Sequence, residues 1–526
     1  MHKRLFLALA CLLVIARLPS LAQPMGADQG LYAYVGERIL AGDIPYRHAW
    51  DQKPPAIHYT YAALRAVWPR EGAAAAADLA AAITIAALLT ALGTSLAGAM
   101  VGRTAALLFL FLSDPGFQRL AGVSVRAQCE TFIALSVTGA VLLLVRSQCA
   151  AWKTVAAGAL LGAAFAFKYN AAAYAATLVI VLWAMRRLSV RELGLLAAGF
   201  PVVPGLLFGV FAVAGAVREL YDATIGYNLL YSGETYDGPG HLVRYLLVFP
   251  IQHARVDALW LLGGAGCAVL LAAAARPGGS GENTRGGFTL KRDRLIAPAW
   301  VAAACLTIAI NGSRGLPQYF VQALPALALA AAWGGSLIWN RRLLVNVAGV
   351  AVVAVAVWRV NEFSSLAANL GHDARYLAGR TTREAHLARY GDRDERKYSA
   401  LAMAELADFI RGRTASDEHI YVFGFASDVY VRAQRESASR FFWSRPVIVN
   451  FNAPQPGYGI EGLRADLERT TPTVVALQVR DWAPDVRNSA EFFMGTPRLS
   501  EWLLRDYDQV PGPRGFDVWA RRGARP

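Results

Sequence analysis

Long apolar runs separated by short polar segments dominate residues 1–358 and then stop. A run of roughly 18 or more apolar residues is long enough to cross the hydrocarbon core of a bilayer. We count about eleven such runs on this criterion, which predicts a polytopic α-helical membrane protein. They lie near residues 5–22, 76–98, 99–113, 131–146, 153–167, 171–185, 193–215, 257–275, 295–310, 319–339 and 343–358.

The pattern changes after residue 359. Amphipathic helical segments at 404–414 and 462–472 alternate with short β-branched runs at 419–425 and 473–479, and the segment 516–522 closes the chain. Helices that alternate with such strands predict a small α/β domain. This part has no G-x-G-x-x-G or P-loop motif, so we expect a cap and not a catalytic domain. Two domains are predicted, a transmembrane catalytic domain over 1–358 and a soluble domain over 359–526.

The charge balance separates these two parts and excludes nucleic-acid binding. The chain has 526 residues, of which 55% are hydrophobic and 17% charged, and its net charge is +14. Residues 359–526 contain 24 Lys and Arg against 22 Asp and Glu, a net of only +2. Most of the positive charge therefore lies between the apolar runs, where it reports membrane orientation and not a nucleic-acid surface.

Short loops rich in Lys and Arg stay on the cytoplasmic side of a membrane. If the runs alternate from a cytoplasmic N-terminus, every basic cluster falls inside. The clusters are His2-Lys3-Arg4, Arg146 to Lys153, Arg186-Arg187-Arg191, Arg276 to Arg294 and Arg341-Arg342. The same alternation places residues 23–75, 114–130, 216–256, 311–318 and 359–526 outside. The N-terminal run ends in "SLAQ", similar to a signal-peptide cleavage site, but Arg17 interrupts the run, so we expect a retained span.

Metal-ligand spacing is absent from the sequence. The five cysteines are scattered, mostly within or beside the apolar runs, and form no C-x-x-C pair. His48, His58 and His253 do not form a zinc spacing either. We therefore expect no structural metal and no requirement for a divalent cofactor.

The first outer segment, residues 23–75, is unusually polar and aromatic. Its residues 29–41 predict an amphipathic helix, and residues 41–55 are rich in turn formers. Asp28 follows shortly after the first run, at the expected membrane boundary. Burial there raises a carboxylate pKa and a nearby cation lowers it, so such an acid is suited to act as a general base; the alternative is a solvated surface charge. The aromatic residues suit an interfacial belt: Tyr32, Tyr34, Tyr46, Trp50, Tyr59 and Tyr61.

Four segments resemble one family, among them the stretch from "ELADFI" to "DEHIYVFGFASDVYVRAQRESASRF", which is similar to the C-terminal domain of many bacterial members. "D-Q-G-x-Y-x-x-x-G-E-x-I-L-x-G-D-I-P-Y" followed by "W-D-Q-K-P-P" resembles the first periplasmic loop of bacterial GT-C glycosyltransferases. The branch is that of protein O-mannosyltransferases, lipid A aminoarabinose transferases and core galacturonosyltransferases. Residues 162–174 are similar to the family's glycine-rich span that ends in lysine, and 312–332 to its R-x-x-x-H/Q-Y element. The resemblance implies a multi-pass GT-C protein of the bacterial cytoplasmic membrane with a periplasmic C-terminal domain.

The resemblance also implies a reaction. Such enzymes transfer a hexosyl or pentosyl group from a polyprenyl phosphate, with inversion, to a lipid, polysaccharide or protein of the cell envelope. Asp28 is the candidate base and Glu130 the second acid, with Asp114 a weaker candidate. Lys53, Lys168 and Arg314 lie at outer ends of runs and are candidates for stabilising the leaving phosphate; the simpler alternatives are snorkelling, helix capping and pairing with lipid. The remaining candidates for substrate contact are Tyr319, Gln322, Asp51 and Tyr59.

A transporter or flippase of lipid-linked sugars is the main alternative. Many spans with polar groups fit a transporter, but transporters often carry internal repeats and polar groups near mid-membrane. This sequence has no internal repeat, and its candidate polar groups gather on one face. The enzyme is therefore favoured, with a lipid-linked sugar, an envelope acceptor and the bilayer as partners.

The orientation can be tested with reporter fusions. Because residue 285 lies in a basic loop and residue 400 in the soluble domain, fusions at these two positions should report opposite sides of the membrane. Activity of both reporters on the same side would contradict the alternation.

Overall fold

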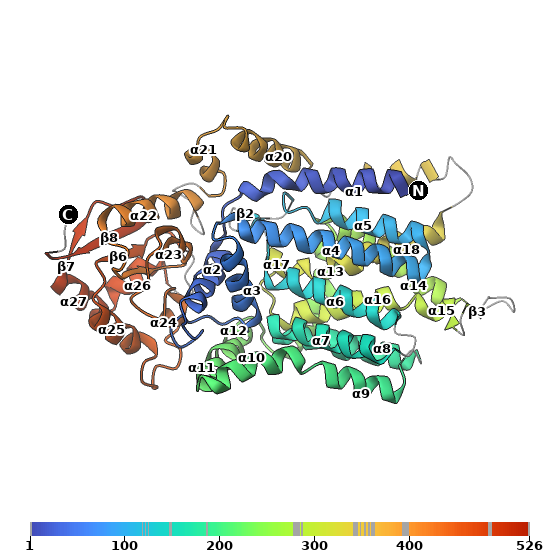
Figure 1. The fold of residues 1–526 in the computed structure, drawn as a ribbon, viewed down its shortest axis with the longest axis horizontal. Helices are drawn as coiled ribbons and strands as arrows, with labels where there is room; N and C mark the ends of the chain where they lie inside the picture. Colours follow the sequence, from blue (N-terminus) through green and yellow to red (C-terminus); the bar gives the residue numbers. More distant parts are fainter. Residues whose placement is uncertain are drawn as a thin grey trace.

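The structure is a computed structural model. It describes residues 3–117, 119–120, 123–124, 126–146, 150–185, 188–276, 284–285, 288–339, 346–347, 349–351, 354–355, 358, 363–391, 399–481 and 486–523. A helical bundle forms one part of the elongated molecule and the C-terminal domain the other. The N-terminal end of the first helix lies at the end of the long axis remote from the C-terminal domain (Figure 1).

The bundle agrees with the apolar pattern. Five segments are long and apolar enough to cross a membrane, by length and composition, and five shorter apolar helices accompany them. The first ten predicted runs coincide with these segments, whereas half of the run at 343–358 lies outside the described residues. The bundle helices are α1 Lys3–Arg17, α4 Gly72–Ala97, α5 Ala99–Leu112, α6 Cys129–Val145, α7 Ala151–Phe167, α8 Ala172–Ala184, α9 Val190–Gly199, α10 Val202–Val213, α14 Ala258–Ala275, α16 Ile296–Ile310, α17 Pro317–Val321 and α18 Leu324–Ile338.

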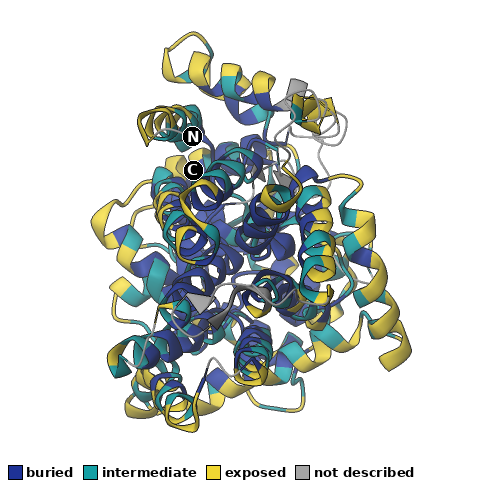
Figure 2. Cartoon of the chain, turned by 90° about the vertical axis from the view of Figure 1, so that its right-hand side faces the viewer, coloured by how far each residue is buried: buried dark blue, intermediate teal, exposed yellow. Residues whose placement is uncertain are grey.

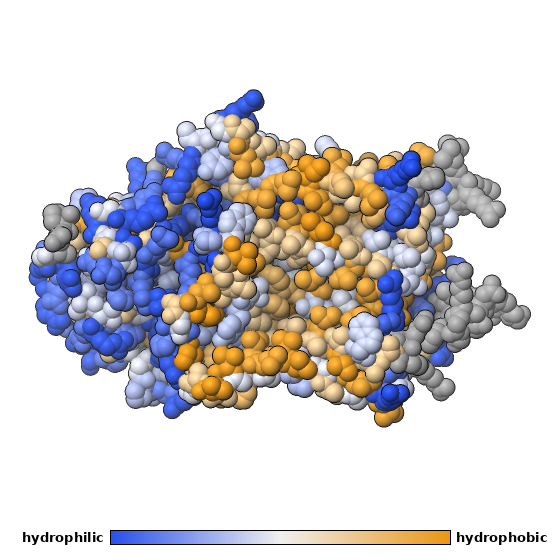
Figure 3. All heavy atoms as spheres, in the orientation of Figure 1, coloured by the Kyte–Doolittle hydropathy of each residue, from blue (hydrophilic) through white to orange (hydrophobic). Residues whose placement is uncertain are grey.

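The surface of the bundle is apolar where a soluble protein would be polar. Figure 3 shows an apolar region between polar surfaces at the two ends of the molecule. Figure 2 shows that peripheral helices turn exposed faces outward around a buried centre. In Pro317–Ile338, 67% of the apolar window is buried, against 11% in Lys3–Ala22. A large exposed apolar surface of this kind is suited to contact with lipid.

The first outer segment folds into two helices, α2 Ala27–Leu40 and α3 Ala56–Val67, joined by the predicted turns. Its aromatic residues do not form the predicted interfacial belt: Tyr32, Tyr34, Tyr46, Trp50 and Tyr61 are all buried. The C-terminal domain covers Tyr34 and Trp50, whereas Tyr32, Tyr46 and Tyr61 pack against one another, against His58 and against Phe211 of α10. The ring of Tyr34 lies 4.6 Å from that of Phe442, and the ring of Trp50 lies 5.9 Å from that of Trp443.

The α2 helix packs very closely against the C-terminal domain. A Cβ added at Gly30 would lie 2.4 Å from the Cβ of Asp428 in α23, and 2.8 Å from its backbone. The backbone N–H of Ser437 donates to the Tyr34 hydroxyl at 2.9 Å, and the Trp443 indole donates to the Trp50 carbonyl at 3.1 Å. The glycine of the D-Q-G motif is therefore a packing residue that lets the neighbouring Asp28 sit under the C-terminal domain.

The C-terminal domain is α/β, as predicted. Strand β5 Ile420–Phe423 pairs in parallel with β6 Val474–Gln478, and β8 Phe516–Arg521 joins β6 and β7 Tyr507–Val510 antiparallel, in the order β5-β6-β8-β7. Strand β7 was not predicted, because its sequence "YDQV" is only partly apolar. The domain's helices are α20 Phe363–Leu377, α21 Arg383–Ala388, α22 Ala400–Arg413, α23 Asp428–Ala433, α24 Arg445–Ile448, α25 Gly459–Thr470, α26 Ser489–Gly495 and α27 Pro497–Asp506.

Residues 216–256, predicted as an outer loop, are largely helical. They form α11 Val217–Tyr221, the π-helix η3 Asp222–Gly226, α12 Tyr227–Gly233 and α13 Pro239–His253. Helix α13 packs against α16 of the bundle. The remaining short elements are η1 Leu18–Ala22, η2 Tyr169–Ala171, α15 Leu290–Asp293, β1 Arg119–Leu120, β2 Val123–Ser124, β3 Thr284–Arg285 and β4 Phe288–Thr289.

The close packing at Gly30 can be tested by adding one methyl group. Gly30→Ala should lower the free energy of unfolding by about 1–3 kcal/mol, the usual cost of overpacking, because its Cβ meets backbone. Gly412→Ala is the matched control, since Gly412 also lies in a helix but has open space around it. The control should be neutral or stabilising. Equal thermal unfolding temperatures for both variants would contradict the packing role.

Candidate functional site

A cavity of about 660 Å³ lies where the first outer segment meets the bundle. Its walls come from residues 52–55, the ends of α7 and α16, helix α10, the π-helix η3 with α12, and Tyr319 of α17. Its polar groups include Lys53 and Lys168, whereas Phe208 and Leu229 on its rim are 50% and 68% exposed. The cavity therefore joins a cationic region to an apolar mouth on the outer surface.

Lys168 is fixed at the C-terminal end of α7. Its side chain is buried and forms an ion pair with Glu130, which is 1% exposed in the first turn of α6. The Lys168 Nζ also lies 4.7 Å from the centre of the Tyr319 ring, a cation–π contact. Because Glu130 is in contact with the lysine and fully buried, the geometry favours a role in positioning Lys168 over direct contact with a sugar.

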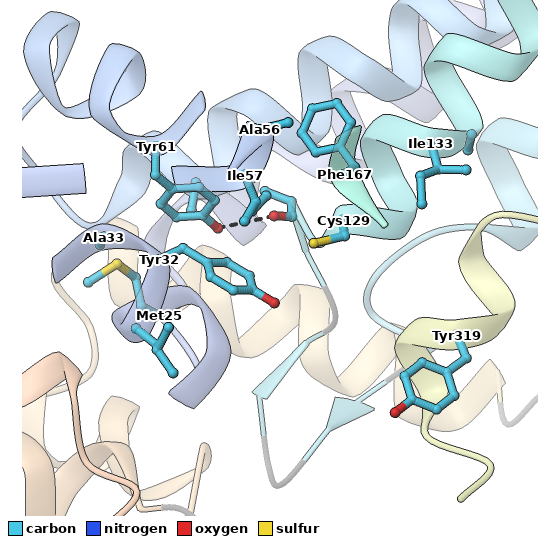
Figure 4. Packing of buried hydrophobic residues seen from close by; sticks show 14 of the residues in the cluster. Met25, Tyr32, Ala33, Ala56, Ile57, Tyr61, Cys129, Ile133, Phe167 and Tyr319 are labelled. Atoms are coloured by element: carbon cyan, nitrogen blue, oxygen red, sulfur yellow. Dashed lines mark hydrogen bonds between the residues drawn. The ribbon is translucent and has the colours of Figure 1, made fainter. Parts of the chain in front are cut away.

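The start of α6 lies beside aromatic side chains of the first outer segment. Figure 4 shows Tyr32 of α2 and Tyr61 of α3 near Cys129 of α6, with Tyr319 of α17 further away. The Tyr61 hydroxyl donates to the Ala127 carbonyl at 3.1 Å. These contacts hold the start of α6, and with it Glu130, against the first outer segment.

Hydrogen bonds to backbone carbonyls fix the position of the segment that carries Lys53. The Tyr46 hydroxyl donates to the Lys53 carbonyl at 2.8 Å, and the Asn228 amide donates to the Gln52 carbonyl at 2.7 Å. Burial alone would lower the pKa of Lys53, but the carboxylates of Asp28 and Asp51 outweigh it and raise that pKa. Lys53 is therefore a cation at neutral pH.

Asp28 lies in the first turn of α2, where the helix N-terminus favours an anion. Gln318 of α17 donates to its Oδ2 at 3.4 Å. Burial raises the pKa of Asp28, and the nearby charge of Lys53 acts in the opposite direction. Asp28 is not a wall of the cavity itself but lies beside Lys53, which is. A carboxylate with a raised pKa next to a cationic cavity is suited to accept a proton there.

Two of the weaker candidates, Asp51 and Gln322, contact residues of the site, and a third, Tyr59, does not line the cavity. Asp51 is 1% exposed, and its Oδ2 lies 3.2 Å from Nε2 of His58. Burial raises the pKa of Asp51, but His58, Lys53 and a backbone N–H together lower it below its usual value. Gln322 is also buried; it donates to the Tyr319 carbonyl at 2.9 Å and accepts from the Tyr174 hydroxyl at 3.2 Å. Tyr59 is half-buried on α3, away from the cavity walls.

Arg314 does not line the cavity itself but packs against a residue that does. Its guanidinium stacks 3.6 Å from the centre of the Tyr231 ring, and Tyr231 lines the cavity. Arg314 also donates to the Tyr231 carbonyl at 2.8 Å and to Glu234 at 3.0 Å. The structure thus brings Lys53 and Lys168 to one cavity, and places Arg314 at its edge. Asp114 lies elsewhere, 3.9 Å from the buried Arg17.

Sequence reasoning missed several residues of the site. Gln318 was within the quoted R-x-x-x-H/Q-Y element, and its place beside Tyr319 could have been used to find it. Asn228 and Tyr231 had no such signal, because they lie in the segment predicted as a loop. The π-helix η3 before them is also without a sequence signature, although such helices are frequent at functional sites.

No group of three or more His, Cys, Asp and Glu side chains in the described parts of the chain is arranged to hold a metal ion. The carboxylates nearest the cavity instead interact with the positive charges of lysines or pair with His58. The expectation that no metal is required therefore stays a prediction.

Comparisons with known proteins agree with this architecture. The sequence matches no protein-family model and no curated protein sequence. The structure matches ArnT from Cupriavidus metallidurans bound to undecaprenyl phosphate with a TM-score of 0.62 and 15% identity, over 99% of this chain and 98% of that one. Apo ArnT gives a TM-score of 0.62 and 16% identity, over 98% and 97%.

A more distant match agrees with the first two. The oligosaccharyltransferase of Archaeoglobus fulgidus, tethered to an acceptor peptide, matches with a TM-score of 0.52 and 10% identity, over 99% of this chain and 74% of that one. These similarities establish the fold: the chain has the fold of ArnT and of this oligosaccharyltransferase, which agrees with the fold that the resemblance of the first outer segment implied.

The pairing of Glu130 with Lys168 can be tested by removing one charge at a time. Glu130→Gln leaves a buried cation without its partner, so it should lower the free energy of unfolding by about 3–5 kcal/mol. The double variant with Lys168→Gln removes both charges and should recover part of that loss. Thermal unfolding in detergent measures both. A wild-type stability for Glu130→Gln would contradict the pairing.

Proposed function

We propose that the protein is an inverting glycosyltransferase that moves a sugar from a polyprenyl-phosphate carrier to a cell-envelope acceptor, on the outer face of the cytoplasmic membrane. One observation carries the proposal. The half-buried Lys53 and the buried Lys168 line a cavity whose rim is formed by exposed apolar side chains of α10 and α12. Such a cavity suits a ligand with a phosphate at one end and a hydrocarbon chain at the other.

The donor fits this site by charge and by position. The phosphate would bind between Lys53 and Lys168, and its isoprenoid tail would leave between Phe208 and Leu229 toward lipid. ArnT, which shares the fold, has been determined bound to undecaprenyl phosphate. Arg314 adds positive charge at the edge of the cavity behind Tyr231.

The reaction follows from the arrangement of charges. Asp28 takes the proton of an acceptor hydroxyl or amine, and the acceptor atom attacks the anomeric carbon of the sugar. The bond between that carbon and the phosphate oxygen breaks on the opposite face, which inverts the configuration. Lys53 and Lys168 stabilise the negative charge that develops on the leaving polyprenyl phosphate. Glu130 holds Lys168 in place for this step, and Gln318 orients Asp28.

The position of the charged groups favours this enzyme over a transporter. A transporter would need a substrate site near mid-membrane with access from both sides. Here Asp28, Lys53 and Lys168 lie at the end of the bundle where the C-terminal domain packs. Transport without transfer would require no base beside the cavity.

The test is a transfer assay with purified protein. Polyprenyl-phosphate sugars carrying hexosyl or pentosyl groups are incubated with membrane extracts as the acceptor source, and released polyprenyl phosphate is measured. Release that depends on both donor and extract supports the transferase. Translocation of the donor across proteoliposomes without release would favour the flippase.

The role of Asp28 can be tested by Asp28→Asn, which keeps the shape and removes the base. The transfer rate should fall by about 10²–10⁴-fold, and Asp28→Glu should recover little because the carboxylate is displaced. Because burial raises the Asp28 pKa, the wild-type rate should fall with decreasing pH at a higher pH than for an exposed aspartate.

Asp43→Asn is the matched control, since Asp43 lies in the same outer segment but pairs with Arg38. It should retain the wild-type rate. A near wild-type rate for Asp28→Asn would contradict the assignment of the base.

A further inference from the structure

Two arginines from different parts of the chain share one carboxylate beside the cavity. Arg314 follows α16 of the bundle, and Arg445 begins α24 of the C-terminal domain. Oε2 of Glu234 accepts from Arg314 at 3.0 Å and from Arg445 at 2.6 Å. No motif in the sequence connects these three residues, and the reaction described above does not use Arg445 or Glu234.

Both guanidinium groups lie against one tyrosine of the cavity wall. The Arg314 guanidinium carbon is 3.6 Å from the centre of the Tyr231 ring, and that of Arg445 is 4.7 Å from it. Arg445 also donates to the hydroxyl of Tyr227 at 3.2 Å. The arginine pair is therefore adjacent to the space that holds Lys53 and Lys168, but it is a separate group of charges.

Arg314 retains a hydrogen-bond donor for another anion. Nη1 of Arg314 is buried and has no hydrogen-bond partner among the described residues. The guanidinium fork is shaped to hold two oxygens of a carboxylate or phosphate, whereas Glu234 offers both arginines the same oxygen. An oxyanion with more oxygens than a carboxylate could also accept a hydrogen bond from Nη1 of Arg314, which Glu234 leaves without a partner in the part of the chain that the structure describes.

The Glu234 side chain can turn away from the two arginines without unfolding of the segment that carries it. Its side chain is 33% exposed, so it borders solvent. Its backbone neighbours are tied to the 309–314 region: Ser313 donates to the Thr235 carbonyl at 2.8 Å, Tyr236 to the Ala309 carbonyl at 2.6 Å, and Arg314 to the Tyr231 carbonyl at 2.8 Å. A rotation of the Glu234 side chain alone would open the arginine pair.

We propose that Arg314 and Arg445 form a second anion subsite, which Glu234 occupies in this structure and which takes a phosphate or carboxylate group of the substrate. Glu234 is then an internal competitor for that anion. The C-terminal domain takes part in substrate binding through Arg445. The source of the anion, either the donor or the acceptor, rests on the proposed function; the subsite itself does not.

The test uses inorganic phosphate and a background without the lysine site. In the Lys53→Gln/Lys168→Gln double variant, adding Glu234→Gln should tighten binding of inorganic phosphate by about tenfold or more, the scale of one charged hydrogen bond. Adding Arg445→Gln or Arg314→Gln to this variant should abolish the gain. Isothermal titration calorimetry in detergent measures the affinities, and thermal unfolding confirms that each variant is folded.

The matched control is Glu219→Gln in the same background. Glu219 pairs with Arg47 at 2.7 Å and is also partly exposed, but neither residue lines the cavity. It should leave phosphate affinity unchanged. The proposal is overturned if Glu234→Gln has no effect, or if its gain survives the loss of either arginine or is matched by Glu219→Gln.

A second measurement identifies the source of the anion in protein with intact lysines. If the subsite takes the donor's phosphate, Glu234→Gln should tighten binding of undecaprenyl phosphate, and inorganic phosphate should compete with it. If it takes a separate anionic group, Glu234→Gln should leave the affinity for undecaprenyl phosphate unchanged. Inorganic phosphate should then still bind to protein that is saturated with undecaprenyl phosphate. Failure of the wild type to bind undecaprenyl phosphate, with the phosphate gain intact, would contradict the donor assignment but not the subsite.

Discussion

Carboxylates that face the two lysines of the cavity, the half-buried Lys53 and the buried Lys168, offset the cost of holding these cations at the end of an apolar bundle. Lys168 is in contact with Glu130, and the pKa of Lys53 is raised by Asp28 and Asp51 against the effect of burial. An isolated ammonium group in such surroundings would lose its proton or destabilise the fold. Much of the surrounding structure serves to bring these acids and bases, which are distant in sequence, to one place.

The C-terminal domain is part of this arrangement, although it has no catalytic motif. It packs on α2 at Gly30, covers Tyr34 and Trp50 of the first outer segment, and extends Arg445 to Glu234. The first turn of α2, which carries Asp28, contacts the domain where the Ser427 hydroxyl donates to the Ala27 carbonyl. The domain is therefore more than a cap: it packs against the turn that carries the proposed base, and it supplies Arg445 as a cation near the cavity.

The sequence predicted much of this because its strongest signals are local. Apolar run length located the bundle helices, strand patterns located β5, β6 and β8, and the first outer motif indicated Asp28 and Lys53. Contacts between segments that are distant in the chain could not be predicted from the sequence. The aromatic residues were predicted at a membrane interface, but tertiary packing buries them, for example Tyr34 and Trp50 under the C-terminal domain and Tyr46 against α10. Tyr231, Glu234 and Arg445 carry no motif, and their meeting depends on how residues 217–238 fold against two domains.

On the proposed function, the cavity between the first outer segment and the bundle holds a polyprenyl phosphate with its phosphate at the two lysines. A structure of the protein determined with undecaprenyl phosphate bound is the decisive experiment. We expect phosphate density within hydrogen-bonding distance of Lys53 and Lys168, and the chain leaving past Phe208 and Leu229. Density for the lipid elsewhere on the bundle, with this cavity empty at saturating ligand, would contradict it.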